Sequence, residues 1–263
     1  MINYGIEDII KEAGGVFLLD NCILTQGSFE EDLSENGYSK IDTSVFIKLN
    51  ASQERVKQFI SDRNVRTIHE VYLEYEQFAR VVKKKYEGLN QNLKRKSSRL
   101  KTQSISEKEK ENKDLLGKFY LKVSKTLKKI KKKVKKYSCS DEVLKAIKHI
   151  QEANDINYKE NLYYLGTDEK LIVAALDLSS FKEPVNILTR DGKIMKTIKA
   201  MIDSYNLLKY FSDTERSNIK TAFVRAFYFD RDLNCENDLE FTYAFDNPRP
   251  KRARRLLRRR LQS

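Results

Sequence analysis

The stretch Gly14-Gly15-Val16-Phe17-Leu18-Leu19-Asp20-Asn21-Cys22 decides the fold class. Four consecutive apolar residues after a glycine pair predict a short strand that is buried on both faces, which is typical of a central strand in a parallel sheet. The strand ends at an aspartate. Because ligands bind outside the carboxyl ends of the strands in an open α/β sheet, the carboxylate of Asp20 faces a candidate site. Asp20 could equally cap the helical turn that begins near Cys22, since aspartate is favoured at the N-cap.

The composition predicts a mostly helical protein of a reducing compartment. The chain has 263 residues, with only nine Gly, three Pro and three widely separated Cys, a cysteine content that argues against a disulfide framework. It has no CxxC motif and only two histidines, so we expect no structural zinc site. The N-terminal segment lacks the basic region of a signal peptide, and no apolar run approaches the roughly 20 residues of a membrane span. We therefore expect a cytoplasmic protein with no membrane partner, or a nuclear one if the source is eukaryotic.

The net charge of +13 is unevenly distributed along the chain. Residues 83–136 contain 21 Lys and Arg against five acids, a local charge of +16. Residues 249–263 contain eight basic residues and no acid, which leaves −11 for the rest of the chain. An acidic body with two strongly basic segments predicts a polyanionic partner.

The first basic segment has the apolar spacing of long helices. Apolar residues recur at alternating intervals of four and three from Leu116 to Tyr137, and a similar pattern runs from Val71 to Leu100. The polar residues 97–113 between them predict a chain reversal, and hence an antiparallel helical hairpin. A lysine-rich helix face can simply be solvated, but an excess of +16 differs from the mixed charges that such faces usually carry.

Acidic residues also follow two other predicted strands and begin one predicted buried helix. Residues 65–69 and 185–189 are expected to form two further short strands, and residues 167–176 a buried helix. Carboxylates that meet at one rim of a sheet repel one another unless cations neutralise them, and Mg²⁺ or Mn²⁺ suits such oxygen ligands. Each acid could instead cap or begin a helix. The acids that follow or begin these elements are Glu70, Glu74, Asp168 and Asp191.

Four short segments resemble, in order, the motifs of the PIN-domain nucleases. These segments are Leu18-Leu19-Asp20-Asn21-Cys22-Ile23-Leu24, His69-Glu70-Val71-Tyr72-Leu73-Glu74, Thr167-Asp168 with the helix after it, and Asn186-Ile187-Leu188-Thr189-Arg190-Asp191. The resemblance covers residues 15–79 and 161–205. Cys22 departs from the pattern, because the family commonly has Asn there. The resemblance implies an α/β protein with a three-layer α/β/α PIN-like fold, a central parallel sheet and metal-dependent hydrolysis of phosphodiester bonds, usually in RNA.

The resemblance also implies roles for individual residues. Asp20, Glu74, Asp168 and Asp191 would be the catalytic, metal-binding acids, with Mg²⁺ or Mn²⁺ as the cofactor. Thr189 would support the site by hydrogen bonding from the strand end. Glu70 lies one helical turn before Glu74 on the same face, so either or both could reach the site, although the motif favours Glu74.

This interpretation divides the chain into four parts. Residues 1–82 and 138–210 would form the PIN-like nuclease core, and residues 83–137 the inserted basic helical hairpin. Residues 211–247 would form a C-terminal β-containing extension, and residues 248–263 a basic tail. RNA is the expected partner, while a ribonucleoprotein, an inhibitor protein or a second copy of the chain remain open.

The basic segments are expected to hold the RNA, because an acid-lined pocket repels a phosphate backbone. The tail could instead be a nuclear address or lie on a membrane surface. The alternative function is an RNA-binding or assembly protein on a PIN scaffold with weak or no catalysis; a DNA nuclease of related fold is a further option. The expected RNA contacts are Lys94, Arg95, Lys96, Lys131, Lys132, Lys133, Arg254, Arg255, Arg258 and Arg259.

Overall fold

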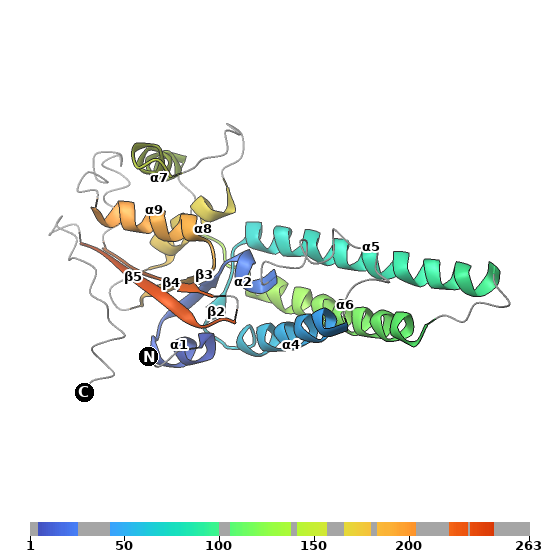
Figure 1. The fold of residues 1–263 in the computed structure, drawn as a ribbon. Coiled ribbons are helices and arrows are strands. Elements are labelled where there is room, and N and C mark those ends of the chain that lie inside the picture. The colour runs from blue at the N-terminus through green and yellow to red at the C-terminus, as the bar shows by residue number, and fades with distance from the viewer. Residues whose placement is uncertain are drawn as a thin grey trace.

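The computed structural model describes residues 5–25, 43–99, 106–137, 141–156, 166–179, 183–203, 221–230 and 232–244 (Figure 1). The basic tail, with its four arginines expected to contact RNA, lies outside these residues, as do the side chain of Lys96 and residues 100–105. The chain reversal predicted over residues 97–113 is therefore shorter than expected, because residues 97–99 and 107–113 are helical. Among the described residues, none of the helices combines the length and the apolar character that crossing a membrane requires.

A five-stranded sheet forms the centre of the body, in the order β2-β1-β3-β4-β5. The strands β1 (Val16–Leu19), β2 (Val65–Arg66), β3 (Val185–Thr189) and β4 (Thr221–Phe229) pair in parallel, and β5 (Cys235–Ala244) pairs with β4 in antiparallel orientation. The α/β class, the mostly parallel sheet and the central place of β1 are therefore confirmed. The segment expected as a C-terminal extension supplies β4 and β5, so it continues the same sheet.

Two strand boundaries differ from the sequence-based expectation. We expected a strand over residues 65–69, but β2 ends at Arg66, because Thr67 pairs with the chain that leaves the hairpin: its N–H donates to Lys133 O at 3.1 Å, and Lys135 N–H donates to its carbonyl at 2.8 Å. The alternation of apolar and polar residues from Leu239 to Phe245 predicts a last strand over those residues. β5 begins four residues earlier, at Cys235, which pairs with Phe229 across a register shift.

Gly15 sets the point where β1 enters the sheet. Its φ angle is +82°, in the left-handed region, and a Cβ atom added there would lie 2.1 Å from the carbonyl oxygen of Pro184. The chain passes this close because Val16 N–H donates to the same carbonyl at 3.0 Å, which starts the pairing of β1 with β3. Only glycine fits this conformation and this approach together.

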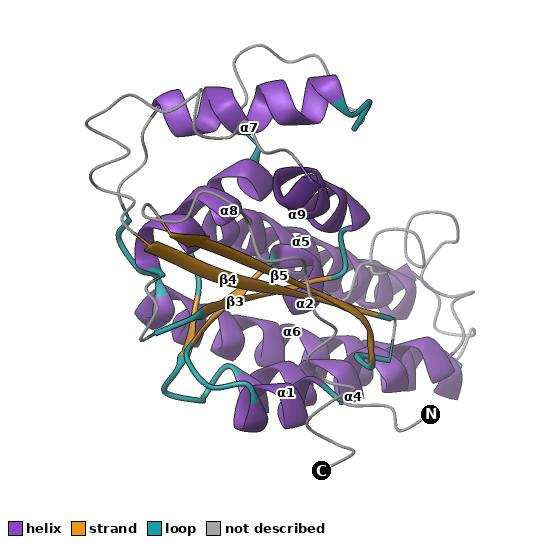
Figure 2. Cartoon of the chain, turned by 90° about the vertical axis from the view of Figure 1, so that its left-hand side faces the viewer, coloured by secondary structure: helices purple, strands orange, loops and turns teal. Residues whose placement is uncertain are grey.

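Helices cover both faces of the sheet. Figure 2 shows α7 (Asp141–Ala153), α8 (Thr167–Leu178) and α9 (Gly192–Asp203) on one side, and α1 (Ile6–Glu12) with parts of the helical projection on the other. The short helix α2 (Asn21–Thr25) follows β1 directly. The buried side chains of β1 and β3 lie between these layers, as expected for strands covered on both faces.

The expected long helical pair projects from the body (Figure 1). It consists of α5 (His69–Arg99) and α6 (Glu107–Lys133), and the expected start of the hairpin at residue 83 lies inside the continuous helix α5. A third helix, α4 (Thr43–Phe59), packs against α6. The apolar spacing of Val56, Phe59 and Ile60 predicts a helix over Ala51 to Arg63, so α4 begins eight residues earlier than the sequence indicates. Its buried face includes the amides of Asn50 and Gln53, which interrupt the apolar pattern that sequence periodicity detects.

Three lysines of α6 are used to hold α4 in place. Lys122 Nζ donates to Asn50 O at 2.9 Å, Lys129 Nζ donates to Lys57 O at 3.3 Å, and Lys133 Nζ donates to the carbonyl of Asp62. Lys129 binds a carbonyl group in the last turn of α4 and Lys133 one in the turn just after it, at the end of a helix where cations are favourable. Lys133, expected as an RNA contact, is therefore engaged within the fold.

Candidate active site at the ends of the central strands

Asp20 lies at the carboxyl end of β1 and is only 4% exposed. Its Oδ2 atom accepts hydrogen bonds from Thr189 Oγ1 at 2.6 Å and from Cys22 Sγ at 2.6 Å. Thr189 ends the neighbouring strand β3, whose Leu188 pairs with Leu19 of β1. Two adjacent strand ends thus meet at this carboxylate, and Thr189 supports it as the resemblance implied.

Cys22 connects the loops that leave the two strands. Its Sγ atom donates to Asp20 and accepts a hydrogen bond from Arg190 N–H at 2.9 Å. Burial and the nearby charge of Asp20 raise the pKa of the Cys22 thiol well above its usual value, so the group stays protonated and can donate. A cysteine therefore orders this corner at a position where the PIN motif commonly has asparagine.

Asp191 caps α9 and also faces Asp20. Its Oδ1 accepts a hydrogen bond from Lys193 N–H at 2.7 Å, as the capping alternative predicts, and its own N–H donates to Thr189 Oγ1 at 2.8 Å. Thr189 thereby bridges the two aspartates. Burial raises the pKa of Asp20, and the charge of Asp191 raises it further. Asp191 can therefore cap α9 and also belong to the candidate site.

Asp168 joins these acids from the first turn of α8. Burial raises the pKa of Asp168 to about 7, with further contributions from the charges of Asp20 and Asp191. The N-cap of α8 is Gly166 rather than Thr167. The hydroxyl of Thr167 does not cap the helix but donates to Glu74.

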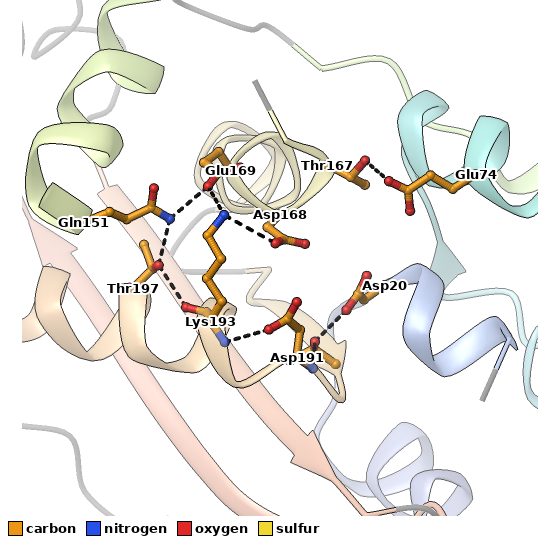
Figure 3. Close-up of polar contacts among 10 residues, drawn as sticks. Asp20, Glu74, Gln151, Thr167, Asp168, Glu169, Asp191, Lys193 and Thr197 are labelled. Atoms are coloured by element: carbon orange, nitrogen blue, oxygen red, sulfur yellow. Dashed lines mark hydrogen bonds and ion pairs between the residues drawn. The ribbon is translucent and has the colours of Figure 1, made fainter. Parts of the chain in front are cut away.

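The structure distinguishes the two glutamates of α5. Glu74 accepts the hydrogen bond from Thr167, and its pKa is raised by burial and by the charge of Asp20. Glu70 points elsewhere: it binds Lys170 Nζ at 3.1 Å and accepts a hydrogen bond from Tyr137 OH at 3.3 Å. Glu74, but not Glu70, therefore belongs with the other acids. We call Asp20, Glu74, Asp168 and Asp191 the acid cluster (Figure 3).

Lys193 is a part of this region that the sequence interpretation missed. Its Nζ atom lies 2.7 Å from Glu169 Oε1 and 3.7 Å from Asp168 Oδ2. Nothing in the motifs indicated it, because a lysine in the first turn of a helix usually points into solvent. The only available signal was its place two residues after Asp191.

The chemistry of the acid cluster suits a hard divalent cation. Four carboxylates, which follow β1 and β3 or lie in α5 and α8, face a common space. The pKa values of Asp20, Glu74 and Asp168 are all raised, first by burial and then by neighbouring carboxylates, so a bound cation would favour their charged forms. Within the described parts of the chain, no three His, Cys, Asp or Glu side chains stand close enough together to hold one ion. Proteins often bind Mg²⁺ through only one or two carboxylates, with water and substrate phosphate completing its shell.

Comparisons with protein-family models, with curated proteins and with solved structures find no match to this chain.

Proposed function

We propose that the acid cluster is the active site of a divalent-cation-dependent endoribonuclease with a PIN-like, three-layer α/β/α fold. The observation that carries the proposal is the meeting of four carboxylates from four separate elements, in the order and at the element ends that the PIN motifs imply. Asp20 directly precedes α2, and its carbonyl accepts from Ile23 N–H at 3.2 Å, so it stands at a helix start as the capping alternative predicts. Capping alone still explains the group poorly, because Glu74 lies inside α5 and yet binds Thr167 and lies in the field of Asp20, while the Asp20 side chain accepts from Thr189 and Cys22. A buried group of like charges is costly unless a cation offsets it.

The cation would be held by Asp20 and Asp191, which Thr189 brings together, with Glu74 and Asp168 reaching it directly or through water. A bound Mg²⁺ or Mn²⁺ supplies Lewis-acid chemistry, polarising a phosphoryl oxygen and lowering the pKa of water. Thr189 and Cys22 keep the Asp20 carboxylate fixed through their hydrogen bonds to Oδ2. Asp191 is fixed in turn by the N-terminal turn of α9.

The overall reaction would be hydrolysis. Water adds to the phosphorus, the bond from phosphorus to the 3′ oxygen breaks, and the products are a 5′ phosphate and a 3′ hydroxyl. The acid cluster offers four carboxylates on which a proton from the attacking water can be held. Asp20 and Thr189, which line it, are nearly fully buried.

The helical projection is the surface we assign to RNA binding. Residues three and four apart share a face of a helix, and Lys125, Lys128 and Lys132 form such a row on the exposed side of α6. Lys118 and Lys131 lie next to this row and are also exposed, as are Lys94 and Arg95 near the end of α5. The lysines that hold α4 lie on the neighbouring side of α6, which packs against α4, so only part of the basic sequence is available for a polyanion.

A cleavage assay tests the proposed function. We expect the purified chain to cut a defined RNA in MnCl₂ and to leave it intact in EDTA, with 5′-phosphate ends on the products. Single- and double-stranded RNA and DNA of the same sequence, assayed in parallel, identify the substrate class. RNA that is bound but never cut in Mn²⁺ would contradict the enzyme and favour an RNA-binding protein on a PIN-like scaffold.

Removing the exposed lysine row should flatten the salt dependence of RNA binding. Each phosphate contact contributes about 0.7 to 0.9 to the slope of log K against log salt concentration, so the triple variant Lys125→Gln/Lys128→Gln/Lys132→Gln should lower the slope by about 2. Fluorescence anisotropy of labelled RNA between 50 and 200 mM KCl measures this, at salt concentrations where the effect is large.

A matched control removes the same charge from another surface. Lys145, Lys196 and Lys199 are exposed on α7 and α9, away from the projection. Their triple Gln variant should keep the wild-type slope. Equal slopes for the two triple variants would show that the row on α6 is not an RNA contact.

A further inference from the structure

Lys193 is part of a closed ring of hydrogen bonds beside the acid cluster (Figure 3). Its Nζ binds Glu169 Oε1 at 2.7 Å, and the same oxygen accepts from Gln151 Nε2 at 2.9 Å. Gln151 Nε2 also donates to Thr197 Oγ1 at 3.0 Å, and the Thr197 hydroxyl donates to the backbone oxygen of Lys193 at 2.9 Å. The ring joins α7, α8 and α9.

The ring is buried more deeply than an ordinary ion pair. Glu169 is 1% exposed, and Gln151 and Thr197 are fully buried. Such polar groups are costly in a core even when paired, and apolar side chains of similar size commonly give equal stability. Two of its atoms, Glu169 Oε2 and Gln151 Oε1, have no hydrogen-bond partner among the described residues. The ring is therefore poorly explained by a contribution to the stability of the fold. It is better explained if it holds the ammonium group of Lys193 in a fixed place.

The ammonium group of Lys193 lies at the edge of the acid cluster. Nζ of Lys193 lies 3.7 Å from Asp168 Oδ2, on the side of Asp168 that faces Glu169. A divalent ion bound to Asp168 on that side would repel the lysine at short range. Lysine binds phosphate oxygens well as a point charge. In two-cation hydrolytic sites the second cation offsets charge on the phosphate, and a fixed ammonium can do the same.

We propose that the ammonium group of Lys193 serves as the fixed second cation of the acid cluster. The cluster then takes a single divalent ion, at Asp20 and Asp191, and Lys193 contacts the scissile phosphate from the side of Asp168. This inference rests on the proposed nuclease function. It adds a catalytic residue and a stoichiometry that the PIN motifs do not contain.

Isothermal titration calorimetry with MnCl₂ tests the stoichiometry without any substrate. We expect one Mn²⁺ per wild-type chain and one in Lys193→Arg, which keeps the charge. Lys193→Met removes the charge and should open a second Mn²⁺ site at Asp168. Lys170→Met is the matched control, because Lys170 has a similar side-chain exposure (26% against 27%) but pairs with Glu70, outside the cluster; it should bind one Mn²⁺.

The RNA cleavage rate gives an independent readout. Lys193→Met should lower kcat by about a hundredfold to a thousandfold, the usual loss for one stabilising charge at a reacting group, while Lys193→Arg recovers part of the rate and Lys170→Met keeps it. Two Mn²⁺ ions per wild-type chain would overturn the proposal even if Lys193→Met failed to fold, as would wild-type kcat in a folded Lys193→Met. Binding of no Mn²⁺ by the wild-type chain would instead refute the proposed function itself.

Discussion

Replacement of Asp20 by Asn should abolish Mn²⁺-dependent cleavage of RNA, with kcat falling at least about a hundredfold to a thousandfold. Asp20 is the carboxylate on which the two central strand ends converge, and the Asn side chain has its shape without its charge. The remaining carbonyl oxygen of Asn can still accept a hydrogen bond from Thr189 or Cys22, so the corner should stay folded. The measurement is single-turnover cleavage of a labelled RNA, with circular dichroism as the check on folding.

The two glutamates of α5 provide a matched pair for the same assay. Glu74→Gln should also lower kcat, because Glu74 is bound to Thr167 and lies in the field of Asp20. Glu70→Gln should leave kcat close to the wild-type value, since Glu70 pairs with Lys170 and Tyr137. Full activity of Asp20→Asn, or equal losses in the two glutamate variants, would contradict the assignment of the site.

Replacement of Asp168 by Asn should stabilise the metal-free protein at pH 8. The pKa of Asp168 rises from its ordinary 3.8 to about 7 in the folded chain. Below the ordinary value both folded and unfolded states are protonated, so Asp168 then contributes no net effect. Between pH 3.8 and about 7, Asp168 is ionised in the unfolded chain but still protonated in the folded chain, so the folded state loses stability as the pH rises. Above about pH 7 the side chain is ionised in both states, and the loss of stability has reached its full size. A shift of this size corresponds to a few kcal/mol, on the order of 1.4 kcal/mol per pKa unit.

Thermal unfolding in EDTA measures this effect. Asp168→Asn should raise Tm at pH 8 by about 2 to 4 °C for each kcal/mol gained, and by much less at pH 4 to 5. Lys193 keeps Glu169 as its nearer partner at 2.7 Å, so the substitution leaves that ion pair in place. Mn²⁺ should narrow the difference at pH 8, because a bound cation offsets the same charge. A Tm difference that is equal at both pH values, or a lower Tm at pH 8, would contradict the charge imbalance of the acid cluster.

The central strands and the meeting of the acids could be predicted because they depend on local pattern and on one topological rule. Val16–Leu19 and Val185–Thr189 are short apolar runs, and parallel strands present their carboxyl ends at one edge. The choice between Glu70 and Glu74 could not be made from spacing, because the two share a helix face. It depends on Thr167 and Lys170, residues of α8 whose positions are set by packing.

The features that were not predicted from the sequence depend on contacts between helices that are distant from one another in the chain. The ring around Lys193 requires α7, α8 and α9 to pack together, with Gln151 and Thr197 separated by 46 residues. The division of the α6 lysines has the same cause: Lys132 is exposed and Lys133 is engaged because α4 packs along one side of α6. The start of α4 at Thr43 was not predicted, although Phe46 and Leu49 continue its inner face, because the buried amide of Asn50 separates them from the apolar residues that follow.

Anomalous diffraction from crystals soaked in MnCl₂ tests most directly whether the distant carboxylates bind one divalent cation. The expected result is one anomalous peak between the carboxylates of Asp20 and Asp191, about 2.0 to 2.2 Å from an oxygen of each, and its loss in crystals of Asp20→Asn. A soaked wild-type crystal with no peak at the acid cluster, or with peaks only elsewhere on the molecule, would contradict it.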